Sequence, residues 1–447
     1  MKREESLLDF KKRMVDPVSD SFCAAKWYNA TIWLGSGRTV SCHHPPAHQV
    51  SVEEIEKNPK ALHNTAIKKK CRSQMQKGER PEECEYCWKI EDIEQGNISD
   101  RIYKSMIYSD EDLRRIAVLD PSEDVNLRTL EIAFDRACNF ACSYCSPTYS
   151  TKWGQDISGN GPYEGFKTQE GLDLSHDGSW ATPYRKSEDN PYVRAFWKWW
   201  PELSRSLQEI RITGGEPLMS AEVWKFFDFF EKNPSRMLFS MNSNLGSPFH
   251  LIEKLAKKSH FLDRMDLYTS CEATGAQAEY IRDGLEFDPY LENVHYLLKH
   301  GKFREMHFMM TINSLCLYSI TDFLEILMDL KSRYGPDYGY ATLNILRHPG
   351  FMSPLVLPDE LRDQRHRHLK GWFQKNKSFP FFNEVEKGSI QRLIDYLDVV
   401  ESPYSGFQKR EDLWKDLKTF YTQYDRRRGK NLIQTFPKEF TDWYRSI

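Results

Sequence analysis

Three cysteines lie within eight residues of the chain, in the stretch "RACNFACSYCSP". Cys138, Cys142 and Cys145 offer three thiolates, which converge easily on a metal centre. Tetrahedral zinc takes four protein ligands when it is structural, and an iron–sulfur cluster also usually takes four cysteines. The spacing therefore predicts a metal centre with either a fourth protein ligand from elsewhere or a position open to a molecule that is not protein.

A second stretch, "RITGGEP", joins two glycines to a glutamate and a proline. Paired glycines allow the backbone to approach a ligand closely, which applies to Gly214 and Gly215. Glu216 supplies an acceptor for an ammonium group, and Pro217 follows it. A plain turn between a strand and a helix would not require the glutamate, so the stretch predicts a binding turn.

Four of the five cysteines in the first 90 residues form a second group: Cys23 in "FCAAKW", Cys42 in "TVSCHHP", and Cys84 and Cys87 in "CEYCW". Four thiolates make a complete zinc site, and by spacing alone zinc competes with an iron–sulfur cluster. His43 and His44 are expected to be bystanders, because four cysteines suffice. Cys71 is a less favoured substitute ligand.

The elements that must position these residues follow from the apolar runs. Six runs are typical of buried strands, and amphipathic helical segments lie between most of them. This alternation predicts an α/β fold with a parallel sheet, open or closed into a partial barrel. Loops that follow the strands carry the active site in such folds, and both motifs follow a predicted strand. The runs span residues 127–135, 207–215, 236–244, 264–272, 304–313 and 338–349.

The remaining segments divide the chain into four predicted parts: a cysteine-rich domain at 1–96 with a hairpin near 28–42, a linker at 97–126, the α/β core at 127–357, and a helical region at 358–447. A polar insertion at about 154–190 is either a lid that contacts substrate or a surface excursion. The aromatic run at 196–200 is expected to pack a helix on the core rather than stack on bases. The basic run at 425–430 is expected to be solvated.

The three-cysteine spacing resembles the signature of the radical S-adenosylmethionine (SAM) enzymes. The resemblance implies a partial (β/α)6 TIM-like barrel and a [4Fe-4S] cluster on Cys138, Cys142 and Cys145, whose open iron binds the amino and carboxylate groups of SAM. Reduction then cleaves SAM to a 5′-deoxyadenosyl radical. It further implies that Tyr144 packs near the adenine, and that the Gly214–Pro217 turn receives the SAM amino group.

Weaker matches to the same family follow along the chain. Asn242, Ser243 and Asn244 end the third predicted strand, where the family places polar SAM contacts. Ser270 ends the fourth strand, and Arg282 resembles an arginine that some members direct at the SAM carboxylate. Each is equally well explained as an ordinary strand-end polar residue or a surface arginine.

The pattern of Cys23, Cys42, Cys84 and Cys87 resembles a small accessory domain, called twitch or SPASM, that holds an auxiliary iron–sulfur cluster. The family usually carries this domain after the core, whereas here the cysteines precede it, as in an N-terminal twitch subgroup. The resemblance implies a second iron–sulfur cluster, with zinc as the competing occupant.

Net charge and apolar patterning indicate the expected compartment and exclude some classes of partner. The formal net charge of -3 over 447 residues gives no basic field of the kind that binds nucleic acid. We find no apolar run of about 18 residues that would span a membrane and no signal-peptide pattern at the N-terminus. We therefore expect a cytoplasmic protein with no membrane partner.

The resemblance implies an oxidoreductase or peptide-modifying enzyme that abstracts a substrate hydrogen and takes electrons from a donor such as flavodoxin or ferredoxin. The favoured substrate is a peptide or protein side chain, and the alternative is dehydrogenation of a sugar or aminocyclitol. A non-catalytic, zinc-stabilised binding scaffold is the hypothesis from a different class, and Glu216 together with the cysteine triplet argues against it.

Overall fold

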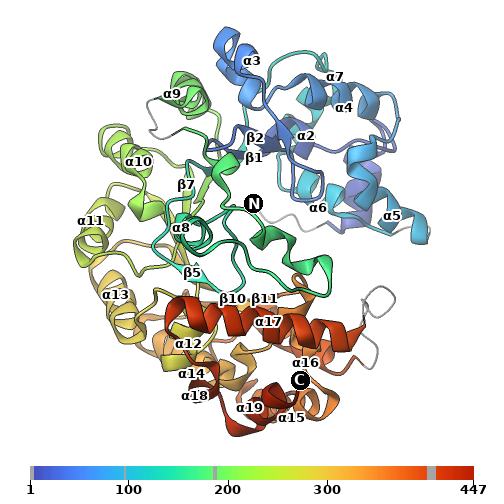
Figure 1. Ribbon diagram of the computed structural model, residues 1–447. Coiled ribbons are helices and arrows are strands. Elements are labelled where there is room, and N and C mark those ends of the chain that lie inside the picture. Colours follow the sequence, from blue (N-terminus) through green and yellow to red (C-terminus); the bar gives the residue numbers. More distant parts are fainter. Residues whose placement is uncertain (1–4, 95–96, 185–188, 400–408) are drawn as a thin grey trace. The chain divides into compact units, whose positions relative to one another are not determined.

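The structure is a computed structural model that describes residues 5–94, 97–184, 189–399 and 409–447 (Figure 1). The chain is mixed α/β, with a large, mainly parallel sheet and many helices. It forms two compact units. The first comprises Met1–Asp135, Thr182–Gly214 and Arg236–Phe239, and the second comprises Arg136–Ala181, Gly215–Ser235 and Ser240–Ile447.

The first unit contains strands in the order β3-β2-β1-β4-β6. Strands β1 and β2 form the predicted antiparallel hairpin, and the chain turns between them through Gly37 at a φ of 71°. Strand β1 pairs in parallel with β4, which pairs in parallel with β6. The cysteine-rich segment thus adds strands beside the first strand of the predicted core. The bounds are β1 Asn29–Trp33, β2 Arg38–Val40, β3 His48–Gln49, β4 Thr129–Ala133 and β6 Glu209–Thr213.

Aromatic side chains from the helices and connections of the first unit contribute to its buried core. Phe22, Trp27 and Trp88 belong to one buried cluster. Phe196 and Trp200 are also buried, which confirms that the aromatic run packs its helix on the core. The helices are α1 Leu7–Phe10, α2 Ala25–Tyr28, α3 Val52–Lys57, α4 Ala66–Gln76, α5 Glu85–Ile93, α6 Asp100–Met106, α7 Asp110–Val118 and α9 Pro191–Leu203.

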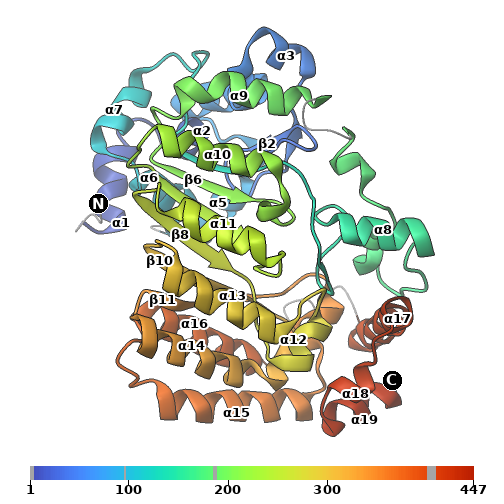
Figure 2. The same ribbon diagram turned by 90° about the vertical axis from the view of Figure 1, so that its left-hand side faces the viewer.

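The second unit repeats a strand–helix alternation. Strands β8, β10 and β11 are parallel neighbours, and Figure 2 shows helices α11 and α13 lying over β8 and β10. All six predicted runs form strands, because each is long, apolar and separated from the next by a helix. The bounds are β7 Leu238–Ser243, β8 Arg264–Thr269, β10 Glu305–Ile312, β11 Tyr338–Ile345, α10 Ala221–Lys232, α11 Phe249–Ser259, α13 Phe287–His300 and α14 Ile320–Tyr334.

The end of the chain is helical, as predicted. A fully buried ion pair between Lys331 and Glu386, with N and O atoms 3.1 Å apart, joins α16 to α14. A short antiparallel ribbon of β5 and β9 lies apart from the main strands. The bounds are β5 Ala141–Cys142, β9 Arg282–Asp283, α8 Thr151–Asn160, α12 Gly275–Ile281, α15 Asp359–Asn376, α16 Glu384–Leu397, α17 Arg410–Arg428, α18 Leu432–Thr435 and α19 Lys438–Ser446.

Two predicted features fall partly outside the described residues: the domain boundary at residue 96, and residues 185–188 of the insertion. The four predicted domain ranges remain predictions. The insertion begins with α8, a helix that the sequence did not indicate because Gly154 and Gly159 lie inside it. Among the described helices, none is long and apolar enough to cross a membrane.

Candidate functional site

The loop that carries Cys138, Cys142 and Cys145 is fixed by the start of α8. Thr151 Oγ1 accepts from the Cys138 N–H at 3.1 Å, and Ser150 Oγ donates to the Phe140 carbonyl at 2.7 Å. Trp153 Nε1 donates to the Cys142 carbonyl at 2.9 Å. These backbone groups are therefore bound by protein, which holds the loop in place around its three thiols.

The chemical state of these thiols follows from their surroundings. Burial raises the pKa of Cys145 to about 12 and also raises the pKa values of Cys138 and Cys142. The thiols are consequently protonated at neutral pH unless a metal takes the place of the proton. The loop thus favours a bound metal centre over free thiolates.

Arg282 reaches the cysteine loop through the β5–β9 ribbon. Cys142 is the ladder partner of Arg282, and the Ser143 N–H donates to the Ile281 carbonyl at 2.7 Å. The guanidinium Nη1 lies 3.9 Å from Cys142 Sγ. The structure therefore brings together two predicted site residues that are 140 positions apart in the sequence.

Glu272 is a functional candidate that the sequence analysis missed. Its carboxylate accepts from Arg282 Nη2 at 2.5 Å and Nε at 3.1 Å, and from the Tyr144 hydroxyl at 3.2 Å. The Thr311 N–H lies 3.4 Å away. The Glu272 and Arg282 side chains are 1% and 4% exposed, so Arg282 is no surface arginine. The available signal was a carboxylate at the end of the predicted run 264–272.

The glycine–glutamate turn lies directly against the cysteine loop. Gly214 has a φ of 127°, and a Cβ atom on Gly215 would lie 2.2 Å from the Ala137 carbonyl oxygen. The Glu216 N–H donates to that oxygen at 2.6 Å. Only glycine permits this close approach, and Pro217 then begins a short 3-10 turn.

The Glu216 side chain is buried, with 1% of the residue exposed. One carboxylate oxygen accepts from the Leu218 N–H at 3.1 Å and from Ser243 Oγ at 2.7 Å, and the other accepts from the Asn244 N–H at 2.6 Å. Burial raises the pKa of Glu216 to about 7, although the hydrogen bonds act to lower it. The carboxyl is therefore poised to ionise when a cationic group approaches.

Asn244, directly after β7, connects the Glu216 carboxyl with the cysteine loop. Asn244 Nδ2 donates to Asn139 Oδ1 at 2.9 Å and lies 4.0 Å from Cys138 Sγ. Oδ1 of Asn242 is buried and has no hydrogen-bond partner among the described residues. Ser270 is half-buried at the end of β8, and no described contact connects it to the cysteine loop.

The prediction that the basic run at 425–430 is solvated is wrong for two of its arginines. Arg427 and Arg428 have side chains only 4% and 6% exposed. Arg428 Nη1 donates to the Tyr163 hydroxyl at 2.5 Å, and the guanidinium forms ion pairs with Asp156 at 3.3 Å and Asp283 at 3.4 Å. Helix α17 thereby lies near α8 (Figure 2) and contacts the β5–β9 ribbon that carries Cys142.

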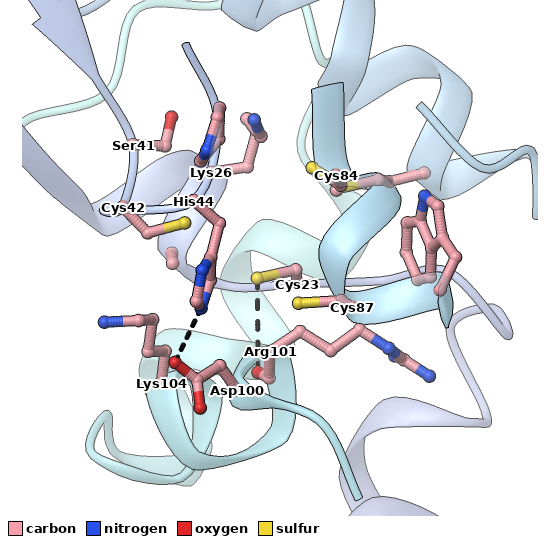
Figure 3. Close-up of a pocket in the computed structure, with 14 residues that line it drawn as sticks. Cys23, Lys26, Ser41, Cys42, His44, Cys84, Cys87, Asp100, Arg101 and Lys104 are labelled. Atoms are coloured by element: carbon pink, nitrogen blue, oxygen red, sulfur yellow. Dashed lines mark hydrogen bonds and ion pairs between the residues drawn. The ribbon is translucent and has the colours of Figure 1, made fainter. Parts of the chain in front are cut away.

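The four cysteines of the first unit line one pocket. Cys23 precedes α2, Cys42 follows β2, Cys84 ends a 3-10 turn and Cys87 lies in α5 (Figure 3). Lys26, Ser41, His44, Trp88 and Arg101 complete much of the wall, and Cys71 is not among the lining residues. The structure therefore brings together the four cysteines that the sequence grouped.

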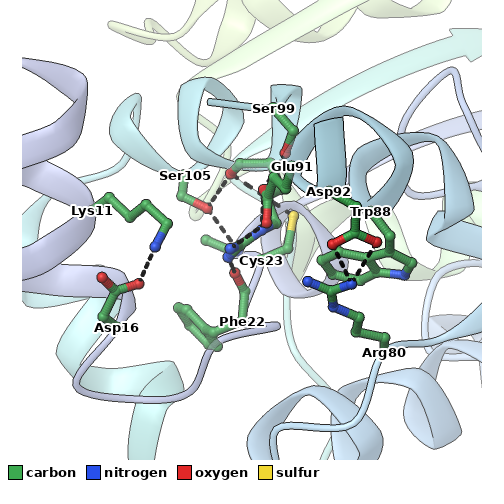
Figure 4. A network of polar contacts seen from close by, with 12 residues as sticks. Lys11, Asp16, Phe22, Cys23, Arg80, Trp88, Glu91, Asp92, Ser99 and Ser105 are labelled. Atoms are coloured by element: carbon green, nitrogen blue, oxygen red, sulfur yellow. Dashed lines mark hydrogen bonds and ion pairs between the residues drawn. The ribbon is translucent and has the colours of Figure 1, made fainter. Parts of the chain in front are cut away.

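Polar contacts hold the pocket wall in place. His44 Nε2 lies 2.8 Å from Asp100 Oδ2, and its ring stacks on Tyr86 with the centroids 3.7 Å apart. His43 is mostly exposed, 3.4 Å from the same carboxylate. Arg101 binds Glu91 at 2.7 Å and donates to the Phe22 carbonyl at 2.9 Å, next to Cys23 (Figure 4).

The spacing of the sulfur atoms bears on which metal fits these sites. Four bonds of about 2.3 Å to a single zinc ion would place the sulfurs about 3.8 Å apart. Across the described part of the chain, which includes every cysteine, no three cysteine sulfurs lie within 4.8 Å of one another. Neither cysteine set is thus drawn together as tightly as the ligands of one bound zinc ion.

Comparisons with known proteins show only remote similarity. No protein-family model matches the chain, and no curated protein matches it. Among solved structures, Streptococcus suis SuiB bound to the precursor peptide SuiA aligns with a TM-score of 0.35 and 12% identity, over 74% of this chain and 65% of SuiB. A second SuiB structure gives 0.33 and 12%, over 74% and 64%. This chain thus spans less than two thirds of the length of SuiB.

Proposed function

We propose that this chain is a radical SAM enzyme whose [4Fe-4S] cluster is held by Cys138, Cys142 and Cys145. The observation that carries the proposal is the position of Glu216, a buried carboxyl that the Gly214–Gly215 turn holds against the cysteine loop. A metal centre with only three cysteine ligands has a position open to another molecule, and the Glu216 carboxyl beside it accepts from an ammonium group. Together these two features suit the amino acid part of SAM. When bound, the cluster and SAM supply the electron transfer and the 5′-deoxyadenosyl radical.

In this proposal the residues of the chain bind and orient the cofactor. Glu216 accepts the SAM ammonium and takes the ionised form on binding, with Ser243 and Asn244 holding its two oxygens. Asn242 Oδ1 is a buried acceptor that has no protein partner within the described ranges and is free to receive a donor from SAM. Ser270 is a further proposed SAM contact.

Arg282 and Tyr144 act from the other side of the loop. The Glu272 carboxylate fixes both, because it accepts from the guanidinium and from the phenol. Arg282 then presents Nη1 toward Cys142, where a positive charge favours the thiolate form and attracts the carboxylate of SAM. Tyr144, stacked under the guanidinium at 5.4 Å, offers its ring to the adenine.

The pocket of Cys23, Cys42, Cys84 and Cys87 is proposed to hold an auxiliary iron–sulfur cluster. The resemblance to the twitch or SPASM domain favours iron over zinc, and the complete set of four thiolates leaves no position for SAM. We propose a peptide or protein side chain as substrate and flavodoxin or ferredoxin as electron donor, on the family resemblance alone.

The test is the iron and sulfide content after anaerobic reconstitution. Two [4Fe-4S] clusters predict about eight irons per wild-type chain. A Cys138/Cys142/Cys145→Ala variant and a Cys23/Cys42/Cys84/Cys87→Ala variant should each keep about four. Cys71→Ala is the matched control, because Cys71 is buried nearby without lining the pocket, and it should keep all of them.

Two results would count against the proposal. Wild-type protein that binds zinc but no iron would refute the enzyme and leave a scaffold. Loaded protein that neither binds SAM nor releases 5′-deoxyadenosine after reduction, with Glu216→Gln behaving as the wild type, would refute the role of the turn. Peptide libraries and aminocyclitols, compared by deoxyadenosine release, then separate the two substrate classes.

A further inference from the structure

Lys68 is a buried lysine without an acidic partner. It lies in α4 with 1% of the residue exposed. Its ammonium donates to Thr39 Oγ1 at 2.9 Å and to the Val40 carbonyl at 3.1 Å, and it lies 3.3 Å from His63 Nδ1. All three partners are neutral acceptors. Among the described residues, no carboxylate forms an ion pair with Lys68.

Arg72 lies one turn later on the same helix and is fully buried. It donates to the Lys26 carbonyl at 3.1 Å, to Asn64 Oδ1 at 3.0 Å and to the Glu123 carbonyl at 3.3 Å. Its remaining contact is His63 Nε2 at 3.0 Å. Within the described ranges this guanidinium also has no carboxylate at ion-pair distance.

Lys26 brings a third buried cation to the wall of the cysteine pocket (Figure 3). It is 2% exposed and forms an ion pair with Glu83, the residue before Cys84. Lys26 also interacts electrostatically with Cys23 and Cys84, and Lys68 with Cys42. Lys26 and Lys68 therefore stand near these cysteines, and Arg72 contacts the backbone of Lys26. Asp100 is a carboxylate of the same pocket wall, on the side of His44.

This arrangement is unfavourable when no anion is present. Buried charges in folded proteins are normally paired, because each loses its hydration. Burial, together with the charges of Lys26 and Arg72, lowers the pKa of Lys68 well below its usual value. Burial also lowers the pKa of Arg72 to about 10. An iron–sulfur cluster on four thiolates carries net negative charge, and this charge increases on reduction. A nearby negative charge raises the pKa of a buried cation, so the cluster would oppose the effect of burial.

We propose that Lys26 and Lys68 are the counter-charge of the cluster held by Cys23, Cys42, Cys84 and Cys87, and that they raise its reduction potential. This inference rests on the auxiliary cluster of the proposed function. Positive charge stabilises the reduced cluster more than the oxidised one, so the site is suited to accept an electron. In such a step one electron would pass from the substrate radical to the cluster, and the proton that the oxidised substrate releases would pass to water.

The experiment measures the midpoint potential of this cluster by spectroscopic titration, in the Cys138/Cys142/Cys145→Ala background so that only one cluster contributes. Lys68→Met removes a buried charge without leaving an unpaired carboxylate. Lys70→Met is the matched control, because Lys70 is exposed on the same helix. We expect Lys68→Met to shift the ratio of oxidised to reduced cluster at least tenfold toward the oxidised form, or about 59 mV, and Lys70→Met to leave it unchanged.

A second pair of variants separates charge from folding. Lys68→Arg keeps the charge and should keep the wild-type potential, whereas Lys68→Gln keeps a donor for Thr39 but should reproduce the shift of the methionine variant. Equal potentials for Lys68→Met, Lys68→Gln and Lys70→Met would overturn the inference while the cluster itself stands. Absence of iron from the four cysteines in the parent protein would instead overturn the auxiliary cluster, and this inference with it.

Discussion

Replacing Arg428 by methionine tests whether the last long helix secures the cysteine loop. The guanidinium lies between the rings of Trp153 and Tyr424, with its carbon 4.4 Å and 4.2 Å from the ring centroids. It also binds Asp156 on α8 and Asp283 on β9. Methionine fills similar space and retains neither the charge nor the hydrogen bonds, so the variant isolates the polar contribution.

The magnitude follows from burial. Removing one partner of a buried ion pair costs roughly 3–5 kcal/mol, because the other charge is left without compensation. Asp156 keeps Arg427 at 3.7 Å and Asp283 keeps Lys430 at 3.2 Å, so part of that compensation remains. We therefore take the lower end, about 3 kcal/mol, which corresponds to roughly a 100-fold change in a local opening equilibrium.

The assay is native-state hydrogen exchange of peptides from α17 and α8. Amide protection in Arg428→Met should fall roughly 100-fold in both helices, and Arg428→Lys should lose less. Arg426→Met is the control, because Arg426 is exposed on the same helix and surface changes are usually within about 0.5 kcal/mol. Equal protection in Arg428→Met and Arg426→Met would refute the reasoning.

Two further predictions concern buried carboxyls. Glu272→Gln should destabilise the second unit by about 3–5 kcal/mol. In chemical denaturation, the Glu272→Gln/Arg282→Met double variant should lose clearly less free energy of unfolding than the sum of the two single variants. Simple additivity would contradict a coupled pair. Glu216 has a folded-state pKa of about 7 against an ordinary 4.5, so its stability contribution is complete below pH 4.5 and falls by about 3 kcal/mol as the pH rises to 7. Thermal unfolding of Glu216→Gln should lack this decline, and parallel pH profiles for the two proteins would show that the carboxyl does not titrate there.

The strands and the cysteine groups were accessible from the sequence because their signals are local. A run such as residues 304–313 is apolar over the length of a strand and is followed by an amphipathic helix, which is enough to predict a parallel unit. The grouping of Cys23, Cys42, Cys84 and Cys87 came from their resemblance to the twitch or SPASM pattern. The position of Glu216 against the cysteine loop follows from two glycines that tolerate close approach.

The missed residues are charged and become buried only through distant partners. Glu272 follows strand β8, and nothing in the neighbouring sequence marks it as buried. Its partner Arg282 lies ten positions later, after helix α12. Arg428 lies in a basic run that is typical of a solvated face, yet its partner Tyr163 is 265 positions earlier. Lys68 belongs to three consecutive lysines, and nothing local distinguishes it from the exposed Lys70. Local pattern predicts where charge lies along the chain but not which charges are buried.

The β5–β9 ribbon has a consequence for the order of events during synthesis. Cys142 obtains its backbone partner only when residue 282 is available, and the guanidinium that braces the ribbon comes from residue 428. The cysteine loop therefore cannot adopt this conformation while the nascent chain is still on the ribosome at residue 200 or 250. In the proposed function, the cluster would therefore be inserted after residue 282 has been translated, when Cys142 has its backbone partner.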